Sequence, residues 1–220
     1  MLIIYNMIDI VQIIQLAIIL AVSIGLHEYA HAYVSYKLGD PTPKLQWRLT
    51  PNPLKHIDPV WFLMIFIIHF GWWKPVQVNP MYYKNPRLWE LMVALAWPAT
   101  NLVLAFFGIL FLIVSSKIIW LWNYINPSDP FIYFWILFSK INVALAIFNL
   151  LPIPPLDGFR LVKMISWEIW EIIEKYTIYI SILFLFIILW PGRGIVWNFL
   201  STTSNWILDF FFMILGQVFY

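Results

Sequence analysis

Residues 8–38 read IDIVQIIQLAIILAVSIGLHEYAHAYVSYKL. Up to residue 26 this stretch has no proline, and its only polar side chains are Asp9, Gln12, Gln15 and Ser23. The stretch therefore predicts one long membrane helix. Its second half contains His27-Glu28-Tyr29-Ala30-His31. Two histidines four residues apart lie on the same face of a helix, where they can share one metal ion. Because ionisable side chains inside a membrane are costly, the cluster favours a functional explanation.

The whole chain is strongly apolar. Of its 220 residues, 62% are hydrophobic and only 11% are charged, and the mean hydropathy is +0.81. Soluble domains carry about a quarter charged residues, so the composition predicts an integral membrane protein. A net charge of +2 without a basic tract argues against a nucleic-acid partner. The absence of cysteine excludes disulfides and thiolate metal ligands.

We expect an all-α polytopic membrane protein with five or six transmembrane helices. The apolar runs place these helices at about residues 8–38, 88–122 (interrupted at Pro98), 131–151, 177–190 and 195–219. Residues 59–73 are apolar but short for a membrane of ~30 Å, so they predict a re-entrant or extra segment. Residues 74–78 predict a small β element near the active site. Charged and apolar residues alternate at helical spacing over 161–176, which indicates an amphipathic helix in the interface.

Positive charge predicts the orientation. Four basic residues follow the first helix (Lys37, Lys44, Arg48 and Lys55), and three follow the short apolar segment (Lys74, Lys84 and Arg87). If the short segment is re-entrant, all seven charges lie in the cytoplasm. We therefore expect a multi-pass protein of the cytoplasmic membrane with its N-terminus outside. The histidine pair would lie near the cytoplasmic side.

A catalytic zinc site uses three protein ligands and leaves one position open. His27 and His31 supply two of them, and Glu28 is placed to act as general base on water at the metal. The candidates for the third ligand are Asp9, His56, His69, Glu90, Asp157 and Asp209. Asp9 is excluded, because it lies about five turns before His27 on the same helix and cannot fold back to it. Asp157 is favoured because it follows a helix that returns to the cytoplasmic side and a proline-rich break that could turn its carboxylate inward. The alternative for Asp157 is a simple turn role, since Asp-Gly is common in turns.

Five motifs now point to a family. They are HEYAHAY at 27–33, NPLKHIDP at 52–59, WWKPV at 72–76, PATN at 98–101 and NLLPIPPLDG at 149–158. In this order and in apolar surroundings they resemble the site-2 protease family, the M50 intramembrane zinc metalloproteases. The resemblance covers roughly residues 20–165 and is strongest to short prokaryotic members without PDZ or CBS domains.

The resemblance implies a function and roles for individual residues. The family cleaves peptide bonds in or near transmembrane segments of other membrane proteins, within the lipid bilayer. It implies one Zn²⁺ per chain held by His27, His31 and Asp157, with Glu28 as catalytic base. Asn149 matches an asparagine thought to hold the substrate or the oxyanion. We expect one membrane-embedded metalloprotease domain over residues 1–220, with a catalytic core at about 8–165 and C-terminal helices at about 176–220.

The substrate-binding residues are less determined. Val76 and Val78 lie in the extended segment, which could capture an unwound substrate by strand addition; the alternative is a plain connecting loop. Asn101 could contact substrate, or it could form hydrogen bonds between helices. The sequence does not indicate the oligomeric state.

Three positions depart from the family pattern. Trp97 stands where the family usually has glycine, Trp73 where a small residue is common, and Gln77 where proline is common. Trp97 must either face lipid or fill space near the substrate path. Two other functions therefore stay open: a non-proteolytic metal-binding homologue acting in binding or transport, and a membrane zinc enzyme with a small or lipid substrate.

Overall fold

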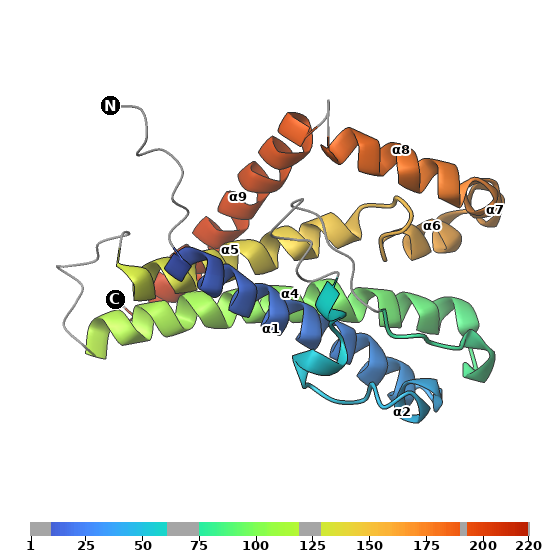
Figure 1. Ribbon diagram of the computed structural model, residues 1–220, viewed down its shortest axis with the longest axis horizontal. Helices are drawn as coiled ribbons and strands as arrows, with labels where there is room; N and C mark the ends of the chain where they lie inside the picture. The colour runs from blue at the N-terminus through green and yellow to red at the C-terminus, as the bar shows by residue number, and fades with distance from the viewer. Residues whose placement is uncertain (1–9, 61–74, 119–128, 190–192, 220) are drawn as a thin grey trace.

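The computed structural model describes residues 10–60, 75–118, 129–189 and 193–219 (Figure 1). Within these ranges four helices are long and apolar enough to cross a membrane: α1 (Ile10–Lys37), α4 (Pro86–Ile118), α5 (Pro130–Leu150) and α9 (Arg193–Phe219). A shorter apolar helix, α8 (Thr177–Leu189), precedes α9. The structure thus confirms an all-helical membrane protein. The described ranges contain no strand, so five or six spans and a small β element stay predictions.

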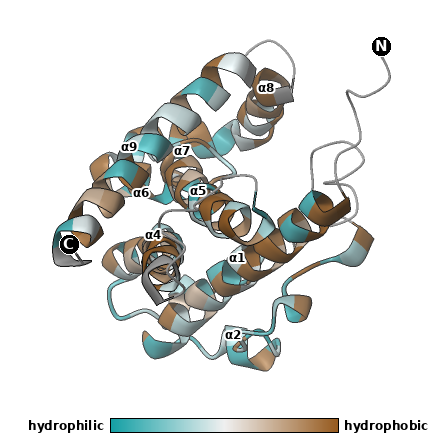
Figure 2. Cartoon of the chain, turned by 90° about the vertical axis from the view of Figure 1, so that its left-hand side faces the viewer, coloured by the Kyte–Doolittle hydropathy of each residue, from teal (hydrophilic) through white to brown (hydrophobic). Residues whose placement is uncertain are grey.

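The long helices form one bundle. α4 packs against α1, α5 and α9, and α5 also packs against α9 (Figure 1). Their contact buries an aliphatic cluster of Ala105, Ile109, Ile113, Val143, Leu208 and Leu215. Figure 2 shows mostly hydrophobic residues along α4 and α5 and a more mixed pattern along α9. On α8, Leu183 and Phe186 are more than half exposed and lie outside the cavity described below, as expected for a surface that lies in lipid rather than water.

A polar chain of hydrogen bonds links three helices of the bundle. Asn142 of α5 donates to Ser23 Oγ of α1 at 2.9 Å, and Asn101 of α4 donates to Asn142 Oδ1 at 3.2 Å. All three side chains are fully buried. Interhelical hydrogen bonds of this kind hold helices together where lipid offers no alternative partner.

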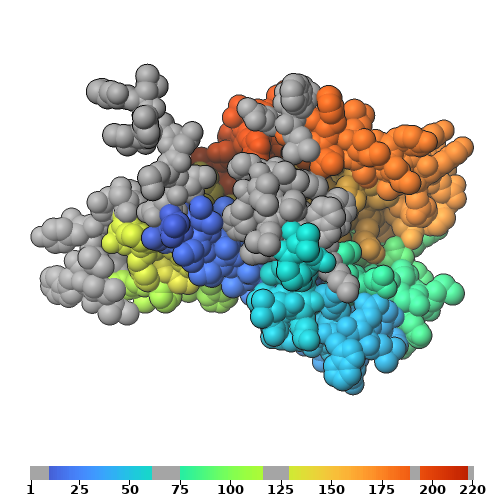
Figure 3. Space-filling model, in the orientation of Figure 1, coloured from blue at the N-terminus to red at the C-terminus, as the bar shows by residue number. Residues whose placement is uncertain are grey.

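Two predictions about helix continuity were wrong. α4 continues through Pro98 without interruption. The predicted amphipathic helix at 161–176 is two helices, α6 (Phe159–Ile165) and α7 (Trp167–Lys175). The break is at Ser166, whose extended backbone ends α6 and whose side chain accepts a hydrogen bond from the Ile169 N–H to cap α7. α7 and α8 form the orange surface in Figure 3, above the loops that follow α1.

The described residues between α1 and α4 include the short helices α2 (Thr42–Leu45), η1 (Pro53–Lys55) and η2 (Pro80–Tyr82). η1 packs directly on α1, because a Cβ on Gly25 would meet Pro53 Cβ at 2.6 Å. Asp9 and residues 61–74, which include His69, Trp73 and most of the predicted re-entrant segment, lie outside the described residues.

Candidate metal centre

α1 supplies three side chains of the site. His27, Glu28 and His31 are all buried, although the helix that carries them begins with an exposed segment at residues 10–14. The His31 Nδ1–H donates to the main-chain carbonyl of Val93 at 2.8 Å. Because Nδ1 is engaged by the backbone, Nε2 is the ring nitrogen of His31 that can bind a metal ion, once it gives up the proton that it shares with Asp157.

A tight loop after α5 brings Asp157 to these histidines. The Gly158 N–H donates to the Asn149 carbonyl at 2.7 Å, which folds the loop back over the end of α5. A Cβ at Gly158 would lie 2.4 Å from the Leu150 carbonyl, so only glycine fits here. The fold thereby places Asp157 Oδ2 at 3.1 Å from His31 Nε2 and 4.0 Å from His27 Nε2.

The donor set fits zinc. One atom each of His27, His31 and Asp157 lies within 4.8 Å of the other two. Tetrahedral zinc with ligands at about 2.0–2.2 Å requires its ligand atoms to be roughly 3.4 Å apart, and the two Asp157 distances bracket that value. Burial by itself raises the pKa of Asp157, but the charge of His31 and its hydrogen bond outweigh burial and hold this pKa below its usual value. Asp157 is therefore present as the carboxylate that a metal ion needs.

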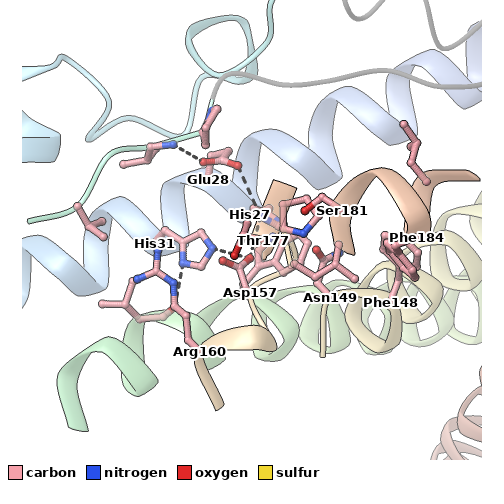
Figure 4. Close-up of a pocket in the computed structure, with 18 of the residues that line it drawn as sticks. His27, Glu28, His31, Phe148, Asn149, Asp157, Arg160, Thr177, Ser181 and Phe184 are labelled. Atoms are coloured by element: carbon pink, nitrogen blue, oxygen red, sulfur yellow. Dashed lines mark hydrogen bonds and ion pairs between the residues drawn. The ribbon is translucent and has the colours of Figure 1, made fainter. Parts of the chain in front are cut away.

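The three ligands and Glu28 line one cavity of about 600 Å³ (Figure 4). Glu28 Oε1 lies 3.6 Å from His27 Nε2, so the carboxylate is beside the donor set. Most of the remaining wall is apolar. It includes Phe148 from α5 and a face of α8 that carries Thr177, Ser181, Phe184 and Ile188. The contribution of α8 to the site could not be predicted from the sequence, because an apolar helix without charged residues has no local signal for a site.

Trp97 fills space beside the metal ligands. Its side chain is 1% exposed, its ring stands edge-on to His27, and it stacks on His31. Of the two sequence alternatives for this residue, facing lipid is therefore excluded. Its indole N–H has no hydrogen-bond partner among the described residues.

The other predicted site residues divide into two groups. Asn149, Val76 and Val78 line the cavity, and the Asn149 amide donates one hydrogen bond to the Leu145 carbonyl at 3.0 Å. Asn101 does not line it, and is instead bonded to Asn142 between helices. Arg160, which the sequence analysis did not select, is a basic residue in the wall, three positions after Asp157.

Three rival metal ligands lie elsewhere. Glu90 forms an ion pair with Lys163 at 2.9 Å. The buried ring of His56 donates from Nε2 to the Thr50 carbonyl at 2.8 Å. Asp209 is exposed on α9. Among the described residues, His27, His31 and Asp157 are the group that converges.

Comparison with known proteins gives consistent matches. The model of peptidase family M50 matches residues 15–189. The chain is 39% identical over 200 residues to "Putative zinc metalloprotease YwhC" of Bacillus subtilis (strain 168), covering 89% of this chain and 90% of that protein. It is 31% identical over 143 residues to "Putative zinc metalloprotease Rip2" of Mycolicibacterium smegmatis, covering 62% of this chain and 51% of that protein. No solved structure gives a significant match.

Proposed function

The chain belongs to peptidase family M50, and we propose that this zinc metalloprotease cleaves peptide bonds in or near transmembrane segments of other membrane proteins. The observation that carries the proposal is the convergence of His27, His31 and Asp157 beside Glu28, in a cavity built by apolar helices. Apolar walls suit the side chains of a transmembrane segment. A buried site on a membrane helix also keeps the reaction apart from soluble proteins.

His27, His31 and Asp157 would hold the zinc. When bound, zinc supplies a Lewis acid that polarises the scissile carbonyl and makes water easier to deprotonate. Glu28 takes the proton from the attacking water and passes it to the leaving amine as the carbon–nitrogen bond breaks. One Glu28 oxygen is 3.6 Å from His27 Nε2, which suits this task.

Asn149 is proposed to stabilise the oxyanion. Its amide uses one N–H on the Leu145 carbonyl and has a second N–H to give. A side-chain amide that donates to a developing oxyanion contributes about 3 kcal/mol. The substrate would run past Val76 and Val78 as an extended chain, because a helix hides its peptide bonds. By the distribution of basic residues, we place the site towards the cytoplasmic side of the cytoplasmic membrane.

The test is zinc content and cleavage, measured on wild type and on Glu28→Gln in lipid bilayers with a set of single-span substrates. We expect about one zinc per chain in both proteins and cleavage at least ~100-fold slower in the variant. Equal cleavage by the variant would remove Glu28 from the mechanism. Zinc in both proteins with no cleavage of any substrate, casein included, would favour the non-proteolytic homologue.

A further inference from the structure

The main chain of the extended segment contacts the proposed base directly. The Val76 N–H donates to Glu28 Oε2 at 2.7 Å. The other oxygen, Oε1, lies 3.6 Å from His27 Nε2. Glu28 is 3% exposed, so water does not compete for the bond. One carboxylate oxygen is thus held by the backbone while the other faces the metal ligands.

The far end of this segment is fixed to the loop that follows α1. The Asn79 N–H donates to Asp40 Oδ2 at 2.8 Å. Asp40 is fully buried and accepts two further hydrogen bonds, from Ser35 Oγ at 2.7 Å and from the Thr42 N–H at 2.9 Å. Hydrogen bonds from Thr42, Asn79 and Ser35 outweigh burial and hold the pKa of Asp40 below its usual value. Asp40 is therefore an ionised side chain that joins Ser35 of α1 to Asn79 of the extended segment.

The extended segment is about as long as the distance along α1 between Glu28, which bonds to Val76, and Ser35, which bonds to Asp40. Glu28 and Ser35 are two turns apart on α1, which is roughly 10 Å. Three residues of extended chain, from Val76 to Asn79, also span roughly 10 Å. The segment from Val76 to Asn79 therefore reaches from the Glu28 end to the Asp40 end only when its chain is extended.

We propose that residues 75–79 are a positioning device for the base: Asp40 holds Asn79, and the Val76 N–H holds Glu28 with Oε1 towards the metal ligands. The inference rests on the proposed function, in which Glu28 is the base. It gives Asp40 and the Val76 main chain a role in positioning Glu28, in addition to the substrate binding predicted for the extended segment. Since Val76 and Val78 line the cavity, the segment would contact both the base and a bound substrate.

The first test removes only the hydrogen bond. Val76 is replaced by its α-hydroxy analogue through nonsense suppression, which converts the N–H into an ester oxygen and keeps the side chain. The matched control is the same change at Val60, an exposed residue whose N–H donates to a carboxylate oxygen of Asp58 at 2.9 Å. We expect kcat to fall about 10-fold or more for the Val76 ester, with KM and zinc content unchanged, because a misplaced base loses part of its contribution. An unchanged kcat, or an equal fall in the Val60 ester, would overturn the proposal.

A second test does not depend on activity. Amide hydrogen exchange at Val76 should become about 10-fold faster or more in Glu28→Ala, because its acceptor is lost, and also faster in Asp40→Asn. Exchange at Val60 should not change. Unaltered exchange at Val76 in Glu28→Ala would refute the positioning device even if Glu28 proves to be the base. If wild type does not cleave but exchange responds as expected, the proposed function fails and the contact stands.

A double-mutant cycle separates positioning from folding. In the proposal, Asp40→Asn and the Val76 ester both act through the position of the Glu28 carboxylate, so their effects on kcat should not add. A purely structural role of Asp40 would lower the melting temperature and leave the two effects additive. Additive effects would therefore limit Asp40 to stability.

Discussion

His31 Nε2 and Asp157 Oδ2 lie 3.1 Å apart although 126 positions separate them in the chain. Helix α1 carries the histidine, and the loop after α5 carries the aspartate. The contact joins the two strongest motifs of the sequence into one donor set, and the following predictions test what depends on it.

Removing the aspartate should remove the metal. Asp157→Ala leaves two histidine ligands, so we expect zinc affinity to fall by at least ~10-fold and the dialysed protein to lose zinc. The measurement is zinc per chain by atomic emission. Asp209→Ala, at an exposed position on α9, is the control and should retain zinc. Full zinc content in Asp157→Ala would exclude Asp157 as a ligand.

The glycine after this aspartate should be irreplaceable. In Gly158→Ala the new Cβ would lie 2.4 Å from the Leu150 carbonyl and 2.5 Å from that of Leu151. Overpacking of this kind costs about 1–3 kcal/mol, and it displaces Asp157. We expect a lower melting temperature in detergent together with zinc loss. Gly194→Ala meets no atom within 4 Å and should show neither effect; a stable, zinc-bound Gly158→Ala would contradict the loop geometry.

Trp97 should limit what fits next to the scissile bond. Trp97→Ala removes a buried ring that packs on both histidines, at a cost of about 3–5 kcal/mol in unfolding free energy. The enlarged cavity should shift preference towards bulkier substrate residues. Cleavage of a substrate series that differs at one position measures this shift. Trp206→Ala, where the ring is 80% exposed, should leave the preference unchanged.

Asn101 should act on stability. Its bond to Asn142 lies between helices and away from the cavity. We expect Asn101→Ala to lower the unfolding free energy by about 0.6–2 kcal/mol and to leave KM unchanged. A raised KM with unchanged stability would instead support the substrate role predicted from the sequence.

Acid should destabilise the loop around His56. Burial lowers the pKa of His56, despite its hydrogen bond to the Thr50 carbonyl. The folded state thus favours the neutral ring. Below about pH 6.5 the unfolded chain takes up a proton that the folded chain resists, so unfolding free energy is full above that pH and falls as pH drops towards the folded pKa.

The check is the melting temperature of wild type and His56→Gln between pH 8 and 5. Glutamine can still donate to Thr50 but does not titrate, so its profile should be flatter. Parallel profiles would mean that His56 does not contribute to the pH dependence.

The sequence by itself determined the class of protein and most of its chemistry. Long apolar runs specify membrane helices locally, because hydrophobic length alone decides whether a helix can span. The predicted span at 8–38 is α1 at Ile10–Lys37, and the one at 131–151 is α5 at Pro130–Leu150. The His27–His31 spacing needs only one helical turn, so it was also visible locally.

Only the tertiary structure decided how distant segments meet. The contact of Asp157 with His31 depends on a loop that closes over Leu150, and the bond from Val76 to Glu28 joins residues 48 positions apart. The apolar wall from α8 and the inward position of Trp97 have no periodic signal, because lipid-facing and cavity-facing residues are equally hydrophobic. In a membrane protein, hydropathy therefore identifies the helices, and packing alone selects which of their faces builds the site.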